Sequence, residues 1–310
     1  MIPTRDHPFN GIYPATICPF KADHSVDEEA LARHFAAMIE VPGIVGILCN
    51  GHAGENFLLS REEKQRNVEI ARATIGERAI VVAGVNCESS LEAVRHARDA
   101  VLAGADAIMV FAPYSWAVSQ DDTMAANHHR MIADAIEAPI MLYQGSINAG
   151  QIAFRAEVLA ELVQIPGVVA IKDGSWEVAA YEANRRLIKE VAPHVAVMGS
   201  GDEHLFTSYV IGSEGSLVSL AIIIPEIIVA LYDAFQAGDM EAARDAHATI
   251  YPLAQAIYGT PPGGHATARL KTCLRLLGRL ENDRVRPPIG PLAKDEVEAL
   301  KGILAEVGLR

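Results

Sequence analysis

The sequence has few cysteines, and their spacing excludes two common kinds of site. Its 310 residues include four cysteines, which form no CxxC pair: Cys18, Cys49, Cys87 and Cys273. Zinc knuckles and thioredoxin-like motifs both need closely spaced cysteines, so the sequence contains neither motif. Free, scattered thiols are typical of a reducing compartment, and we expect a cytoplasmic location.

Positive charge is also scarce. Lys and Arg number 26 against 39 Asp and Glu, which gives a net charge of −13. A surface this negative repels phosphate backbones and acidic lipid headgroups, so we expect neither nucleic acid nor membrane as a partner. Residues 1–10 contain no apolar stretch of the secretory type, and export by that route is not expected.

No run of hydrophobic residues is long enough to predict a membrane span. The most apolar tract, residues 215–232, contains Pro225 and Glu226 near its middle, where a charge would be costly in lipid. This tract predicts a buried strand that leads into a buried helix.

Several cofactor and metal motifs are absent. Neither GxGxxG nor GxxxxGK[ST] follows the first predicted strand, which disfavours a nucleotide-binding fold. Among 11 histidines there is no HExxH or strand-end HxH, and His128 and His129 are adjacent rather than four residues apart. We therefore expect no metal and no cofactor, with a metal-dependent enzyme kept as an alternative.

The rest of the composition is that of an ordinary folded protein, with 50% hydrophobic and 21% charged residues. Short aliphatic runs alternate with longer amphipathic segments, and continuous apolar runs suit strands buried on both faces of a parallel sheet. Eight strands are predicted, at residues 11–19, 44–50, 79–85, 107–112, 139–143, 168–172, 195–198 and 215–219.

Helices are predicted between these strands. Ser60 with Glu63, and Ser89 with Glu92, have the spacing of capping boxes. The clearest helical segments are residues 28–40, 121–137, 155–164, 177–191, 203–211 and 225–237.

Strands and helices in strict alternation predict a (β/α)8 TIM barrel at residues 1–237. A doubly wound open sheet is the competing fold. Residues 238–310 carry three further helical stretches, at 239–257, 265–280 and 294–307, and predict a C-terminal helical appendage.

In a TIM barrel the active site lies at the carboxyl ends of the strands. Of seven lysines only Lys172 ends an apolar strand, where desolvation lowers the pKa of the amine and favours attack on a carbonyl. A lysine that meets solvent or pairs with Asp173 is the structural alternative. Tyr143 ends the neighbouring strand, and its phenol can move protons beside the amine, unless it only fills the barrel mouth.

Two glycine-rich turns belong to the same face of the barrel. Gly51, His52, Ala53 and Gly54 follow the second strand, and their backbone N–H groups can bind a carboxylate. His52 can bind a carboxylate or hydroxyl, although a structural role is nearly as common. Gly199 opens a second such turn after the seventh strand, and a plain turn is the alternative there.

Together these residues resemble the dihydrodipicolinate synthase and N-acetylneuraminate lyase family of class I, Schiff-base-forming aldolases. The resemblance runs from Gly11 through Gly51-x-x-Gly54-Glu55, Tyr143 and Ile171-Lys172-Asp173 to Gly199-Ser200-Gly201-Asp202. It implies that Lys172 forms an imine with a 2-oxo acid, that Tyr143 transfers protons, and that residues 51–54 surround the carboxylate. It also implies a homotetramer, a dimer of dimers.

The chain departs from the family pattern around the second substrate. The family's hydroxyl residues between the two glycines are His52 and Ala53 here, and the second of two adjacent tyrosines is Ser115. Asn148 lies where an arginine usually grips the acceptor carboxylate. These changes disfavour a typical dihydrodipicolinate synthase, and Trp116 suggests a flatter or less acidic acceptor.

The favoured function is a lyase or aldolase acting on a 2-oxo acid, with Lys172 and Tyr143 as catalytic residues. The expected substrate-binding residues are Gly51, His52, Ala53, Ser115, Asn148 and Gly199. Two alternatives use the same fold: a dehydratase of a 2-keto-3-deoxy sugar acid through the same imine, and a non-catalytic binding protein.

Overall fold

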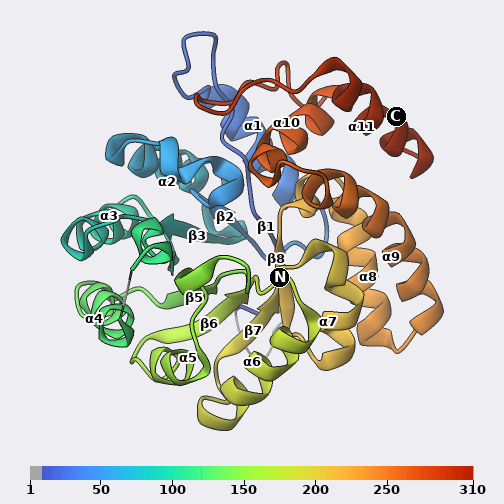
Figure 1. The fold of residues 1–310 in the computed structure, drawn as a ribbon. Helices are drawn as coiled ribbons and strands as arrows, with labels where there is room; N and C mark the ends of the chain where they lie inside the picture. The colour runs from blue at the N-terminus through green and yellow to red at the C-terminus, as the bar shows by residue number, and fades with distance from the viewer. Residues whose placement is uncertain (1–8, 120, 310) are drawn as a thin grey trace.

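Eight parallel strands form the centre of the molecule in the computed structural model, which describes residues 9–119 and 121–309 (Figure 1). Their apolar side chains are buried on both faces, as parallel sheets require. The strands are β1 Gly11–Pro14, β2 Gly46–Cys49, β3 Ile80–Val85, β4 Ala107–Val110, β5 Ile140–Gln144, β6 Val168–Asp173, β7 Ala196–Gly199 and β8 Gly215–Val218.

The sheet closes into a barrel. From β2 to β8 each strand pairs with the next one in the sequence, and β8 pairs with β1. Between β1 and β2 the closure consists of two isolated parallel bridges, Ile12 to Ile44 and Ala15 to Leu48. The predicted TIM barrel is therefore confirmed.

A helix follows each strand on the outside of the barrel. These helices are α1 Glu28–Ile39, α2 Arg61–Ile75, α3 Ser90–Leu102, α4 Asp122–Ala133, α5 Ala156–Leu162, α6 Val178–Val191, α7 Leu205–Ile211 and α8 Pro225–Ala237. Several helices are shorter than predicted. A 3-10 turn or a loop replaces residues at one end of each.

Local capping signals were confirmed at one helix and not at the other. At α2 the Ser60 hydroxyl accepts from the Glu63 N–H while the Glu63 carboxylate accepts from the Ser60 N–H, a complete capping box. At α3 the Ser89 side chain makes no cap hydrogen bond, so the predicted box is wrong there.

The apolar tract at residues 215–232 folds as predicted, into β8 and then into α8, which begins at Pro225. Proline suits the first turn of a helix, where its missing N–H would have no partner. Among residues 9–119 and 121–309, none of the helices combines the length and the apolar character needed to cross a bilayer.

Three helices follow the barrel, as the sequence predicts: α9 Met240–Ala254, α10 Ala266–Leu276 and α11 Lys294–Glu306. A π-helical turn, Gln255–Gly259, continues α9. Helix α9 lies against α8, and α10 contacts the short 3-10 turn η1, His52–Gly54, after β2 (Figure 1). The domain boundary at residue 237 stays a prediction.

Strand alternation decides which side chains point into the barrel. Met141 on β5 and Ala170 on β6 belong to the cluster of buried apolar side chains that fills the barrel interior. Side chains two residues further along a strand share the same face, so Tyr143 and Lys172 also point inward. An irregularity in register between Ile140 and Met141 lets the two strands bring these residues level.

Candidate active site

A cavity of about 320 Å³ opens at the carboxyl ends of the strands. Its walls come from strand ends, from the turns after them and from the C-terminal helical region. The lining residues are Ala15, His52, Ala53, Phe57, Tyr114, Tyr143, Lys172, Trp176, Ser200, Asp202, Val218, Ser219, Tyr258, Gly263, Gly264, Ala266, Thr267 and Leu270.

Lys172 and Tyr143 are paired across β5 and β6 in this cavity. The Lys172 Nζ lies 5.6 Å from the centre of the Tyr143 ring. Desolvation lowers the pKa of Lys172 from 10.5 to about 8, against the opposing effect of the Asp202 carboxylate. A substantial fraction of the amine is thus unprotonated and nucleophilic near neutral pH.

The Tyr143 phenol is held in its protonated form. Burial, with a smaller effect from Asp173, raises its pKa to about 12. At neutral pH the group is therefore a hydrogen-bond and proton donor placed beside a nucleophilic amine.

The turn after β2 contributes His52 and Ala53 to the lining of the cavity. Two residues adopt the left-handed conformation at its ends, Asn50 with φ 54° and Glu55 with φ 55°. The Gly54 N–H donates to the Gly51 carbonyl, whereas the N–H groups of His52 and Ala53 meet no acceptor within the described part of the chain. Two adjacent free N–H groups form a concavity suited to an anion.

Gly51 has a positional role in this turn and does not line the cavity. A Cβ atom added there would lie 2.9 Å from the Leu48 side chain, too close for an ordinary contact. The glycine therefore lets the turn pack tightly on β2.

His52 presents a neutral imidazole to the same cavity. Its ring centre lies 4.4 Å from that of Phe111 and 5.3 Å from that of Tyr143. Burial, reinforced by the nearby Lys172 charge, lowers its pKa to about 3. The Nε2 atom is buried and has no hydrogen-bond partner among the described residues.

Three other expected residues lie outside the lining of the cavity. Gly199 donates its N–H to the Ser213 hydroxyl, and it is Ser200 that faces the cavity. Ser115 is exposed and donates its N–H to Glu88.

The third is Asn148, whose exposed side chain belongs to a turn closed by a hydrogen bond to Ser146. Proximity in sequence to the end of β5 therefore does not place Asn148 in the lining of the cavity.

Trp116 packs in the protein core and does not line the cavity, where a contact with the acceptor substrate was expected. Its side chain is only 4% exposed and packs edge-on against His128, with ring centres 5.5 Å apart. The indole at the cavity is that of Trp176, which follows β6.

The structure adds residues that sequence reasoning missed. Asp202 was noticed only as part of the turn after β7; it is 2% exposed and accepts a hydrogen bond from the Leu220 N–H. Burial raises its pKa to about 7. Tyr258, in the π-helical turn, shares a hydrogen bond with Ser219, and nothing in the sequence signalled that a residue 86 positions after Lys172 would share its cavity.

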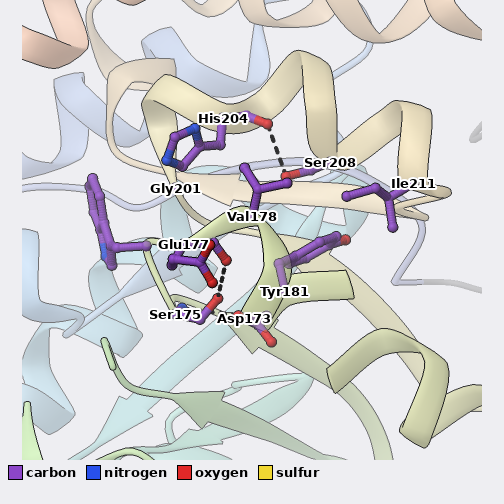
Figure 2. Close-up of a pocket in the computed structure, with 10 residues that line it drawn as sticks. Asp173, Ser175, Glu177, Val178, Tyr181, Gly201, His204, Ser208 and Ile211 are labelled. Carbon is purple, nitrogen blue, oxygen red and sulfur yellow. Dashed lines mark hydrogen bonds between the residues drawn. The ribbon is translucent and has the colours of Figure 1, made fainter. Parts of the chain in front are cut away.

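A second, smaller pocket shares Trp176 with this cavity, and its lining residues show how the turn after β6 is fixed (Figure 2). The Asp173 carboxylate accepts hydrogen bonds from the Ser175 N–H at 2.9 Å and from the Asn184 side chain at 2.8 Å. The Ser175 hydroxyl in turn donates to the Glu177 carbonyl (Figure 2). Asp173 thus serves the turn and makes no ion pair with Lys172.

Comparison with known proteins decides the family. The model of the dihydrodipicolinate synthetase family matches residues 8–307. The chain belongs to this family. An uncharacterized DapA-like lyase of Halobacterium salinarum is 31% identical, over 97% of this chain and 94% of the relative. A 4-hydroxy-tetrahydrodipicolinate synthase of Methanothrix thermoacetophila is 30% identical, over 96% and 97%.

Solved structures agree with this membership. YagE of Escherichia coli, described in complex with pyruvate, superposes with a TM-score of 0.90 at 26% identity, over 97% of this chain and 99% of that chain. The chain is accordingly an enzyme of the lyase class, and the resemblance drawn from its motifs is confirmed.

Proposed function

We propose that the protein is a Schiff-base-forming lyase or aldolase that acts on a 2-oxo acid, with pyruvate or a pyruvyl compound as substrate. The observation that carries the proposal is the partly deprotonated amine of Lys172 in an enclosed cavity beside the protonated phenol of Tyr143. An amine in this setting can attack a carbonyl without help from a metal.

The reaction begins when the Lys172 amine adds to the keto carbon of the substrate. The resulting carbinolamine loses water, for which the Tyr143 phenol donates a proton to the departing hydroxyl. The protonated imine then accepts the electron pair of the carbon–carbon bond that breaks, and an enamine forms. In the opposite direction the same enamine attacks an aldehyde.

The carboxylate of the 2-oxo acid is assigned to the turn after β2. The free N–H groups of His52 and Ala53 supply two donors, and the His52 imidazole faces the same cavity. The relative YagE, described in complex with pyruvate, supports a pyruvate-type substrate.

Carbon–carbon cleavage or formation is the favoured outcome of the imine. A putative 2-dehydro-3-deoxy-D-gluconate aldolase of Escherichia coli, 28% identical over 97% of the chain, supports this chemistry. Loss of water from a 2-keto-3-deoxy sugar acid through the same imine is the second candidate, and analysis for released pyruvate separates the two.

The assembly proposed for the active protein is a homotetramer built as a dimer of dimers, in the cytoplasm, with no nucleic-acid or membrane partner. The exposed aromatic rings of Phe57 and Tyr114 beside the cavity support a subunit contact there. Sedimentation measurements on the purified protein test the tetramer.

Reductive trapping tests the central step. Borohydride added with pyruvate should leave a stable adduct, and peptide mass analysis should place it on Lys172. The variant Lys172→Met is the matched control and should form none. Absence of an adduct with a range of 2-oxo acids, or an adduct on another lysine, would refute the proposal.

A further inference from the structure

The cavity offers almost no positive charge to a second substrate. Lys172 is the one Lys or Arg side chain among the described residues that line it. In the imine this charge belongs to the first substrate. His52 is neutral, and Asp202, whose pKa burial raises to about 7, adds no positive charge to the wall.

The first residues of α10, Ala266 and Thr267, also line the cavity, and a helix N-terminus attracts anions. That attraction is worth only about 0.3–1 kcal/mol in an exposed setting. An unpaired carboxylate or phosphate loses several kcal/mol on leaving water. The balance therefore disfavours an anionic group in the part of the cavity beyond Lys172.

An aromatic wall occupies that part of the cavity. The rings of Trp176 and Tyr258 lie with centres 5.0 Å apart. Trp176 has a φ of 57°, which a bulky residue rarely adopts. The hydrogen bonds of Asp173 with the Ser175 N–H and the Asn184 side chain hold the turn that carries Trp176, and such strain persists only where the surroundings enforce it.

We propose that the second substrate of this enzyme is an uncharged aldehyde, without carboxylate or phosphate, whose apolar face rests against Trp176 and Tyr258. This inference rests on the proposed Schiff-base function. The imine of pyruvate loses a methyl proton to the Tyr143 phenolate that dehydration of the carbinolamine left, and an enamine forms. The enamine carbon then bonds to the aldehyde carbon while the aldehyde oxygen takes that proton from Tyr143, and water hydrolyses the imine and frees Lys172.

Matched pairs of aldehydes test the charge requirement. With pyruvate trapping on Lys172 established first, aldol formation is measured with butanal against succinic semialdehyde and with glyceraldehyde against glyceraldehyde 3-phosphate. We expect kcat/KM to be at least about tenfold higher for the uncharged member of each pair. Equal or higher values for the charged members overturn the inference while leaving the trapped imine, and so the proposed function, intact.

A third probe distinguishes two kinds of apolar face. Benzaldehyde carries a flat aromatic ring, whereas glyceraldehyde presents C–H groups and hydroxyls. Turnover of either one supports an uncharged acceptor. Turnover of neither, with activity on an acidic aldehyde, contradicts it.

Added positive charge should weaken the preference for an uncharged aldehyde. Nothing lies within 4 Å of a Cβ atom built on Gly264, which lines the cavity, so a side chain can begin there without a clash and Gly264→Arg adds a guanidinium at the cavity wall. We expect the preference for butanal over succinic semialdehyde to fall at least about fivefold, since an arginine forms a strong pair with a carboxylate. Gly302→Arg, on α11 with equally open space, adds the same charge elsewhere and should leave the ratio unchanged. An unaltered ratio in the first variant counts against the inference.

The aromatic wall is tested by ring replacement. Trp176→Ala should raise the KM for the aldehyde about tenfold or more and leave the KM for pyruvate within about twofold, whereas Trp176→Phe should retain most of the binding. Equal effects on both substrates would show that Trp176 only supports the fold, and would overturn its part in the inference.

Discussion

At the scale of single residues, Lys172 gains its reactivity from where it lies. It has the same chemistry as the other six lysines of the chain, but its strand ends among apolar walls, and desolvation disfavours the ammonium form. The same enclosure has the opposite effect on Tyr143, because burial disfavours phenolate. One environment thus yields a partly deprotonated amine and a protonated phenol.

The reactivity of Lys172 should follow this pKa. Acetylation of Lys172 by acetic anhydride, followed by peptide mass analysis, should accelerate through a midpoint near pH 8 instead of 10.5. The reason is that only the unprotonated amine reacts. A midpoint above pH 10 would contradict a desolvated amine.

Replacing Lys172 should separate activity from stability. A lowered amine pKa means that the protonated form is penalised by folding at neutral pH, and Lys172→Met removes this penalty. We expect the variant to form no pyruvate adduct and to gain about 1–3 kcal/mol in free energy of unfolding at pH 7. Urea denaturation checks this, and a variant less stable than the native protein would show that the amine is not desolvated.

Loss of the Tyr143 hydroxyl should slow chemistry with little effect on the fold. Tyr143→Phe removes the proton donor beside Lys172, and general acid–base groups contribute roughly 10²–10⁴-fold to rates. We expect kcat to fall within that range while the melting temperature stays close to that of the native protein. A kcat within threefold of the native value would remove Tyr143 from the mechanism.

At the scale of elements, an ion pair joins the C-terminal helices to the turn after β2. Lys271 on α10 donates to the Glu55 carboxylate, and their side chains are 1% and 0% exposed. Glu55 also accepts from the Arg286 N–H at 2.9 Å. Because Glu55 ends the turn that carries His52 and Ala53, the helical region helps to fix the backbone of these two residues.

Breaking this pair should be costly. Lys271→Met leaves the Glu55 carboxylate buried without its counter-charge, and such losses cost about 3–5 kcal/mol. The matched control is Arg66→Ala, which breaks the half-exposed pair with Glu28 and should cost about 0–1 kcal/mol. Urea denaturation at pH 7 measures both. Equal losses in free energy of unfolding for the two variants would mean that the buried pair of Lys271 and Glu55 contributes no more to stability than the exposed pair.

At the scale of the whole molecule, buried neutral histidines make stability depend on pH. Burial lowers the pKa of His34 and His129 to about 4 and that of His52 and His128 to about 3. Below pH 6.5 the unfolded chain binds protons at these sites and the native protein does not, so stability falls as the pH falls from 6.5 toward 4. Asp202, with its raised pKa, acts in the opposite sense below pH 7.

The double variant His128→Asn, His129→Asn isolates the effect of two of these groups. Each histidine that is neutral in the native protein and protonated in the unfolded chain changes the free energy of unfolding by up to about 1.4 kcal/mol per pH unit. We therefore expect the free energy of unfolding of the variant to change less between pH 6.5 and 4.5 than that of the native protein, as measured by urea denaturation. An equal slope would show that these histidines are already protonated in the native state.

The sequence alone determined the fold and the centre of the candidate site. Eight apolar runs with helices between them fix a barrel, because strands buried on both faces leave a signal that is continuous along the chain. The ends of two of these runs marked Lys172 and Tyr143, since the carboxyl ends of neighbouring parallel strands meet at one rim.

Only the tertiary structure decided which loop residues reach the cavity. Ser115 and Asn148 follow strand ends closely yet lie outside its lining, Trp116 is part of the core, and Trp176 and Tyr258 supply the aromatic wall instead. Loop conformation depends on hydrogen bonds and packing between segments far apart in the chain, as with Asp173 and Asn184 or Tyr258 and Ser219. Such contacts leave no periodic trace in a single sequence.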